Sequence, residues 1–249
     1  MSVNYIHSKE IHNTAAAEEV LPYLFTLINP RSVADIGTGT GSWLAVAKSC
    51  GATTILGVDG IKVESSMLCI PENTFVQADL TGPVCFSQTY DLAICLEVAE
   101  HLPAAAADQL VSTLASCSDI LLFSAAIPGQ GGQAHLNEQW PEYWQEKFRK
   151  HQLYPVDILR ERFWDNPRVD WWYKQNMLLY MTKERAATLG LKVVERLPHY
   201  IHPELLALKL HILEETQQAY EKLEEIINRE INHPRFLPSL KRLFKSLVS

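Results

Sequence analysis

Residues 32–41, with a carboxylate at Asp35 and glycines at Gly37, Gly39 and Gly41, constrain the fold of this chain more than any other segment. The first five residues are typical of a buried strand, and the glycines alternate with threonines over a turn that can open a helix. Glycine allows a backbone bend closed to residues with a Cβ, and it lets a ligand lie against exposed N–H groups. The segment therefore predicts a nucleotide-type cofactor at the carboxyl end of a strand.

The spacing of these glycines separates two kinds of nucleotide site. A dinucleotide fingerprint needs G-x-G-x-x-G directly after the strand, with the pyrophosphate on the helix N-terminus. This chain has G-x-G-x-G instead, and Asp35 stands two residues before the first glycine. A carboxylate there repels a pyrophosphate but attracts an ammonium group, such as the one that S-adenosylmethionine carries.

With these residues the chain resembles the class I S-adenosylmethionine-dependent methyltransferases. Further segments match that family in order: residues 55–60, 75–80, 90–102 and 120–124. In the family, the acid that ends the second strand, here Asp59, holds the two ribose hydroxyls. A carboxylate suits this role because it can accept a hydrogen bond from both hydroxyls. The acid of the third motif meets the adenine amino group, and the loop after the fourth strand borders the methyl group.

The resemblance implies a set of cofactor-binding residues: Asp35, Gly37, Thr38, Gly39, Gly41, Asp59, Gly60, Ala78, Asp79, Leu80 and Glu97. An alternative for Asp59 and Asp79 is that each only caps a helix that follows it.

The alternation of strand and helix signals predicts an α/β fold. We expect a Rossmann-like, doubly wound, seven-stranded and mostly parallel sheet with an antiparallel edge hairpin, plus a C-terminal helical extension. The expected hairpin strands are residues 154–160 and 176–182. Helices are expected at 14–28 and 140–151 and after Gly41, Ile61 and Pro103. The predicted parts are an N-terminal helix and lead-in (1–30), the cofactor-binding core (31–183) with an acceptor insertion (125–175), and the extension (184–249).

Composition limits the partners. The formal net charge of −7 argues against a nucleic-acid substrate, which requires a basic footprint. The chain shows no apolar run of membrane-spanning length and no secretory signal, so we expect a cytoplasmic protein without integral membrane contact. The five cysteines form no C-x-x-C pair and are expected to be reduced packing residues on strands and helices.

The acceptor site is expected where the regular alternation of strands and helices along the chain stops, in the loop at 125–140 and in residues 163–173. Most tryptophans fall in this part of the chain, and aromatic side chains can wall a substrate pocket. The predicted acceptor-binding residues are His135, Trp140, Trp164, Trp171 and Trp172. The alternative is a small satellite core beneath a long insertion.

The chemistry that the resemblance implies is an in-line displacement of the cofactor's methyl group by an acceptor oxygen or nitrogen. A hydroxyl acceptor must lose a proton, and histidine commonly accepts protons near neutral pH. The predicted catalytic residues are His135, as general base, and His101, which shapes the pocket. Glu97, His101, His135 and Glu138 show no fixed ligand spacing, so no metal is expected.

The predicted function is methyl transfer to a hydroxyl, or an amine, of a small-molecule metabolite, since the region after residue 137 resembles a bacterial subgroup associated with glycan or secondary metabolism. An NAD-type oxidoreductase on the same fold and a non-catalytic cofactor-binding adaptor are the alternatives.

Residues 203–231 form a long helical pattern that predicts a homodimer or packing against its own core. The basic amphipathic tail at 234–249 predicts docking on the acidic remainder of the protein or on a membrane surface.

Overall fold

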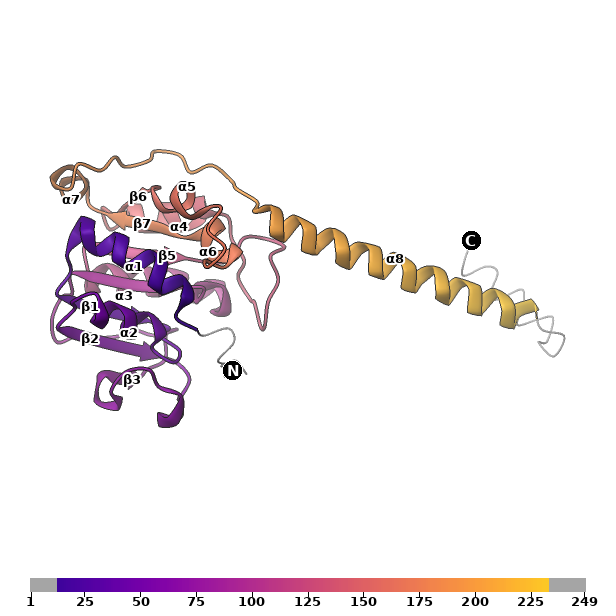
Figure 1. Cartoon of the computed structure of the whole chain (residues 1–249), viewed down its shortest axis with the longest axis horizontal. Helices are drawn as coiled ribbons and strands as arrows, with labels where there is room; N and C mark the ends of the chain where they lie inside the picture. The colour runs from indigo at the N-terminus through magenta and orange to yellow at the C-terminus, as the bar shows by residue number, and fades with distance from the viewer. Residues whose placement is uncertain (1–12, 233–249) are drawn as a thin grey trace. The chain divides into compact units, whose positions relative to one another are not determined.

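A seven-stranded sheet forms the centre of the structure, a computed structural model that describes residues 13–232 (Figure 1). The strand order is β3-β2-β1-β4-β5-β7-β6. Strands β1 to β5 pair in parallel, while β7 runs antiparallel to both β5 and β6. The strands are β1 (Ser32–Ile36), β2 (Thr54–Asp59), β3 (Phe75–Gln77), β4 (Leu92–Leu96), β5 (Ile120–Ser124), β6 (Tyr154–Val156) and β7 (Leu178–Met181). The predicted fold class and its antiparallel edge are confirmed.

Each face of the sheet is covered by its own hydrophobic core. Helices α1 (Ala15–Ile28), α2 (Ser42–Ser49) and α5 (Leu159–Phe163) contribute to one core, with Leu92 and Ile94 of β4. Helices α3 (Ala107–Cys117) and α4 (Pro141–Arg149) contribute to the other, with Ala93 and Cys95 of the same strand. Because both faces are buried, the strands are apolar runs rather than alternating ones.

Two expected elements differ in the structure. In place of the helix expected after Ile61 there are two short 3-10 turns, η1 (Ser65–Met67) and η2 (Glu72–Thr74). The Cys69 N–H donates to the Thr40 carbonyl at 2.8 Å instead of to a helical carbonyl, and Pro71 follows. The strand expected at 154–160 ends at Val156. Beyond it, the guanidinium of Arg160 donates to the carboxylate of Asp157 at 2.9 Å as the chain turns into α5.

The chain divides into two units, Met1–His202 and Pro203–Ser249, so the first unit extends past the expected boundary at 184. This unit also contains α6 (Trp171–Asn176), α7 (Lys183–Thr188), η3 (Ala99–His101) and η4 (Ala104–Ala106). Leu197 is buried in a core, and the backbone N–H of His202 donates to Gln175 Oε1 at 2.8 Å. These contacts hold residues 184–202 to the α/β unit. Residues of α1 that pack in the core make this helix part of the unit as well.

The second unit is described as one helix, α8 (Pro203–Asn232). It carries exposed apolar side chains, namely Leu206, Leu208, Leu210, Ile212, Leu213, Tyr220, Leu223 and Ile226. Its role in a homodimer stays a prediction, and the basic tail at 234–249 lies outside the described residues. Among the described residues, no helix has the length and apolar character needed to span a membrane.

The cysteines are all free, but the packing role predicted for them holds only in part. Cys95 and Cys117 are buried, whereas Cys69 and Cys85 are exposed. The exposed pair lies in the irregular segments before β3 and β4, where the expected regular elements are absent.

Candidate active site

The glycine bend after β1 forms as predicted, but it does not offer free N–H donors at its start. Gly37 has a φ of 84° and Gly39 a φ of 54°, both in the left-handed region. The N–H of Gly37 donates to the Val58 carbonyl at 2.7 Å, and the N–H of Gly39 donates to Asp59 Oδ2 at 2.8 Å. A Cβ on Gly37 would lie 2.2 Å from Val98 Cγ2. The bend therefore supplies shape and open space, and the expectation of exposed N–H groups at Gly37 and Gly39 is wrong.

Two buried carboxylates lie at the carboxyl ends of strands, Asp35 as the next-to-last residue of β1 and Asp59 as the last residue of β2. Asp35 accepts a hydrogen bond from Thr38 Oγ1 at 2.9 Å. Burial, together with the charge of Asp59, raises the pKa of Asp35 to about 7, although the Thr38 hydrogen bond lowers it. Asp59 also accepts from the N–H of Ile61 at 2.8 Å through its other oxygen. The Asp59 carboxylate thus joins the glycine bend to the end of the neighbouring strand.

The third carboxylate, Asp79, is exposed and fixes its own turn. Its Oδ1 accepts from Thr81 Oγ1 at 2.7 Å and from the Thr81 N–H at 2.9 Å. These hydrogen bonds lower the pKa of Asp79. No α-helix follows directly after Asp59 or Asp79 in the described chain, so neither acts as a helix cap.

A cavity of about 860 Å³ contains most of the predicted site residues. From the cofactor set it is lined by Asp35, Gly37, Thr38, Gly39, Asp59, Gly60, Ala78, Asp79, Leu80 and Glu97. From the catalytic and acceptor sets it is lined by His101, His135, Trp171 and Trp172. The cavity lies at the carboxyl ends of β1 and β4, where the strand order reverses, which is the usual ligand position in a doubly wound sheet.

Three predicted residues do not line this cavity. Gly41 is the N-cap residue before α2, and a Cβ there would lie 2.7 Å from Ile70 Cγ1, so the lack of a side chain at this position permits close packing. Trp140 stacks on His199, with ring centroids 4.5 Å apart. Trp164 packs against the ring of His202, with centroids 4.6 Å apart. For Trp140 and Trp164 the satellite-core alternative describes the structure better than a substrate wall.

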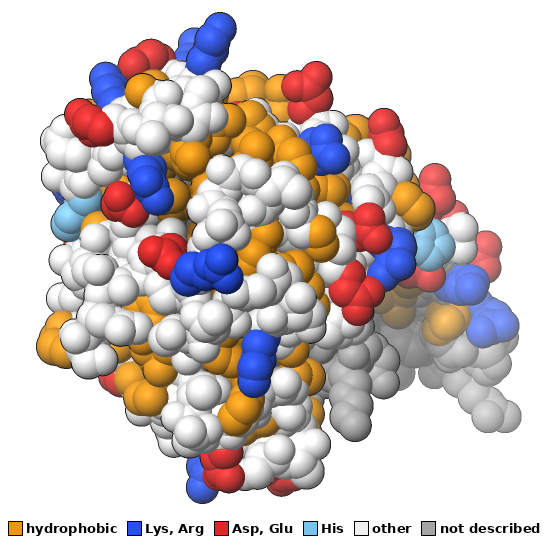
Figure 2. Space-filling view, turned by 60° about the vertical axis from the view of Figure 1, so that its left-hand side comes forward, with side chains coloured by type: hydrophobic (Ala, Val, Ile, Leu, Met, Phe, Trp, Pro, Cys, Tyr) orange, Lys and Arg blue, Asp and Glu red, His pale blue; other side chains and the backbone are white. Residues whose placement is uncertain are grey.

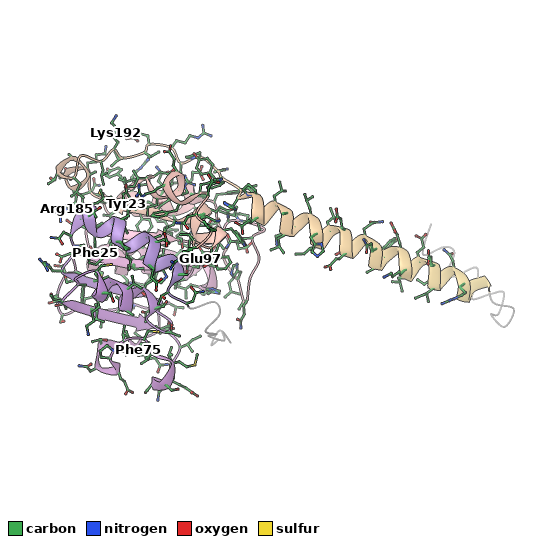
Figure 3. All side chains as sticks on the ribbon, viewed as in Figure 1. Tyr23, Phe25, Phe75, Glu97, Arg185 and Lys192 are labelled. Carbon is green, nitrogen blue, oxygen red and sulfur yellow. The ribbon has the colours of Figure 1, made fainter. Side chains whose placement is uncertain are left out.

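Glu97, labelled in Figure 3, directly follows β4. Its backbone is strained, with a φ of 52° that residues other than glycine rarely adopt. Gln130 Nε2 donates to its Oε2 at 2.9 Å, and Asn176 Nδ2 donates to its Oε1 at 3.1 Å. Burial raises the pKa of Glu97, although these amides lower it. Sequence reasoning missed Gln130 and Asn176, because nothing local indicates contacts across the fold.

Glu100 and His101 lie on the 3-10 turn η3, directly after this strand end. Glu100 is fully buried beside the carboxyl of Glu97 and the backbone of Ala126, and neither of its carboxylate oxygens accepts a well-formed hydrogen bond in the described part of the chain. Burial and the nearby charge of Glu97 raise the pKa of Glu100 well above its usual range. Burial and the neighbouring His135 lower the pKa of His101 to about 4, so its imidazole is neutral at physiological pH.

His135 reaches this turn from the loop after β5. The Leu136 N–H donates to the Glu100 carbonyl at 2.7 Å, which fixes the loop against η3. His135 Nδ1 lies 2.8 Å from Glu138 Oε1, and Glu138 also accepts from the N–H groups of Gly129 and Gly131. Although burial raises the pKa of Glu138, these hydrogen bonds outweigh it and the pKa falls. The ionised Glu138 favours the His135 tautomer with its proton on Nδ1 and its lone pair on Nε2.

The fold and the position of the cavity together define a nucleotide-cofactor protein, and His101 and His135 line the same cavity. Residues 9–166 match a family described as a methyltransferase domain. The chain therefore belongs to the class I S-adenosylmethionine-dependent methyltransferases. This membership decides against the oxidoreductase alternative.

Solved methyltransferase structures share the fold. Magnesium protoporphyrin IX methyltransferase (ChlM) from Synechocystis PCC 6803, with bound SAH, is 17% identical with a TM-score of 0.51, covering 73% of this chain and 90% of that one. CalS10, an amino pentose methyltransferase from Micromonospora echinaspora with bound SAM, is 12% identical with a TM-score of 0.52. The match covers 72% of this chain and 98% of CalS10. An S-adenosylmethionine-dependent methyltransferase from Clostridium acetobutylicum is 11% identical with a TM-score of 0.52. The match covers 70% of this chain and 95% of that protein. The comparison with curated proteins gives no match.

Proposed function

We propose that this enzyme transfers the methyl group of S-adenosylmethionine to a hydroxyl of a small polar or aromatic metabolite. The observation that carries the proposal is that one continuous cavity is lined both by the acids and glycines of the cofactor motifs and by His101, His135, Trp171 and Trp172. A group-transfer enzyme needs its two ligands in contact, and a shared cavity provides this.

The residues of the cofactor half fit S-adenosylmethionine. Asp35 is a buried carboxylate that gains a partner in the ammonium group, and Asp59 and Asp79 retain acceptor lone pairs for hydroxyl and amino donors. The cofactor supplies a methyl group that is already activated on a sulfonium. The protein therefore has mainly to bind, orient and exclude water.

The acceptor half suits a small molecule. Trp171 and Trp172 line it, with their rings 5.4 Å apart and nearly perpendicular, and they are positioned to pack on a ring or sugar. Lys and Arg side chains are scattered singly over the face in Figure 2 rather than gathered in a basic stripe. Together with the net charge of −7, this disfavours a nucleic-acid acceptor. Two of the structural neighbours are named for acting on a porphyrin and an amino sugar, which supports a small acceptor.

His135 activates the acceptor hydroxyl in this proposal. In the simplest form its Nε2 accepts the hydroxyl proton while Glu138 stabilises the resulting imidazolium. His101, with a pKa of about 4, stays neutral and positions the acceptor. An amine acceptor, already nucleophilic when neutral, would depend less on His135.

Mass spectrometry of the protein as purified tests the proposal, together with calorimetry against S-adenosylhomocysteine and NAD. We expect binding of S-adenosylhomocysteine but not NAD, and transfer of labelled methyl from S-adenosylmethionine to a hydroxylated metabolite from a panel of sugars and phenols. His135→Ala should lower kcat about 100-fold for a hydroxyl acceptor. Cofactor binding without turnover of any acceptor would favour the adaptor alternative, and failure to bind S-adenosylhomocysteine would reject the proposal.

A further inference from the structure

We propose that Glu100, His101 and His135 bind one divalent transition-metal ion inside the acceptor half of the cavity. These residues each offer a ligand atom, and the ligand atoms all lie within 4.8 Å of one another. All three residues line the cavity. Ligands about 2.1 Å from one ion stand roughly 3 to 4 Å apart, so a small contraction would complete the site.

The buried Glu100 carboxylate, which meets a second carboxylate and no cation, points to a ligand. Its side chain is fully buried beside the carboxyl of Glu97 and the backbone of Ala126, and neither oxygen accepts a well-formed hydrogen bond from the described residues. Burying a carboxylate without a countercharge is strongly unfavourable, which is why such groups normally pair with a cation or coordinate a metal. The neighbouring carboxylate, Glu97, also accepts hydrogen bonds from Gln130 and Asn176, so Glu100 is the member of the pair that lacks amide donors and is open to a cation.

The histidines are arranged as metal ligands usually are. The rings of His101 and His135 meet edge to face, with centroids 4.9 Å apart. A histidine that binds a metal almost always donates its other ring N–H to a carboxylate or carbonyl, which fixes the tautomer. His135 has this arrangement, since Nδ1 is engaged by Glu138 at 2.8 Å and Nε2 is left for the metal.

The ligand set indicates the class of metal. Two imidazole nitrogens and one carboxylate suit Zn²⁺, Mn²⁺ or Co²⁺ better than Ca²⁺ or Mg²⁺, which prefer oxygen ligands. Three protein ligands leave coordination positions open toward the cavity. The sequence predicted no metal because the candidate ligands show no fixed spacing along the chain. In the folded protein, Glu100, His101 and His135 nevertheless lie close together.

The site deepens the proposed function, and its catalytic role rests on that function. A hydroxyl coordinated to the ion loses its proton more readily, and the proton passes to solvent water. The acceptor oxygen then forms a bond to the methyl carbon as the carbon–sulfur bond breaks and the sulfur keeps the electron pair. In this form His135 acts as a ligand rather than as the base, because a coordinated Nε2 has no lone pair left for a proton.

Calorimetric titration of the tag-free, chelator-treated full chain with Mn²⁺ and Zn²⁺ tests the site without reference to activity. We expect one ion per chain and a loss of affinity of at least about tenfold in each of Glu100→Gln, His101→Asn and His135→Asn. His151→Asn, at an exposed histidine in the turn after α4, is the matched control and should bind like the wild type. No binding by the wild type, or wild-type affinity in all three variants, would overturn the proposal.

Two further measurements separate the possible failures. Electron spin echo spectroscopy of the Mn²⁺-loaded wild type should show coupling to imidazole nitrogen, which tests the ligands even if a variant does not fold. An absence of nitrogen coupling would contradict the site. S-adenosylhomocysteine binding, measured with and without the ion, tests the proposed function alone: cofactor binding without metal binding refutes only the metal site, and metal binding without cofactor binding refutes only the proposed function.

Discussion

The rings of His101 and His135, thirty-four positions apart in the chain, lie edge to face with centroids 4.9 Å apart. One comes from the turn after β4 and the other from the loop after β5, and the Glu100 carbonyl joins these segments by accepting from the N–H groups of Leu136 and Asn137. The pair lies in the cavity that also contains the cofactor motifs. Several consequences of this arrangement can be measured.

Gly132→Ala should misplace His135 without unfolding the protein. A Cβ at this position would lie 2.3 Å from His135 Nε2, so the ring must move and its bond to Glu138 weakens. Because misplacement of a catalytic group by about 1 Å can cost about 100-fold, we expect kcat to fall by about that factor with S-adenosylhomocysteine affinity unchanged. Gly82→Ala, whose Cβ meets nothing closer than 3.8 Å, is the control. Normal kcat in Gly132→Ala would contradict the role of His135.

Asp35 should make the cofactor-free protein less stable as the pH rises. Its folded-state pKa of about 7 lies above the usual 3.8, so its contribution is fully present below pH 3.8 and is lost as the pH rises through about 7. The difference corresponds to about 4 kcal/mol at most. Denaturant unfolding of the cofactor-free protein at several pH values should show this slope, and Asp35→Asn should remove most of it. An unchanged slope in the variant would assign the dependence to other groups.

The same carboxylate should make cofactor affinity depend on pH. If the ammonium group pairs with ionised Asp35, binding below pH 7 must release the Asp35 proton, and affinity falls up to about tenfold per pH unit. Calorimetry in buffers of different ionisation enthalpy measures that proton release directly. Binding at pH 6 with no proton released would show that Asp35 does not face the ammonium group.

The tryptophans should separate into two pairs by their effect on the acceptor. Trp171→Ala and Trp172→Ala remove side chains that line the cavity, and we expect the acceptor KM to rise about tenfold in each. Trp140→Ala and Trp164→Ala remove rings that pack on His199 and His202 instead, so they should lower the melting temperature and leave KM within about twofold. An equal rise of KM in all four variants would contradict this division.

Asp157→Asn should destabilise the α/β unit while leaving cofactor affinity intact. Arg160 is 1% exposed, and its guanidinium pairs with Asp157 and donates to the Pro198 carbonyl at 3.2 Å. Removing the partner charge leaves a buried cation, which costs about 3 kcal/mol. Urea unfolding measures the loss, with calorimetry against S-adenosylhomocysteine as the control. A change below about 1 kcal/mol would show that the Pro198 carbonyl suffices for Arg160.

The sequence by itself determined the cofactor half of this protein. Strands, the glycine bend and the acids at strand ends are encoded by residues close together in the chain, because periodicity, turn conformation and strand polarity are local properties. Those patterns predicted the sheet, and every residue they assigned to the cofactor except Gly41 lines the cavity. They failed after Ile61, where a hydrogen bond from Cys69 to the distant Thr40 carbonyl replaces the expected helical one.

Only the tertiary structure decided the acceptor half. Whether a tryptophan lines the cavity or packs in a satellite cluster depends on which distant residues it meets, as Trp140 does with His199. Similarly, Gln130 and Asn176 meet at Glu97, and His135 meets His101, through loop contacts between residues 33 to 79 positions apart. Such contacts are set by packing and hydrogen bonds across the fold, which no local pattern encodes.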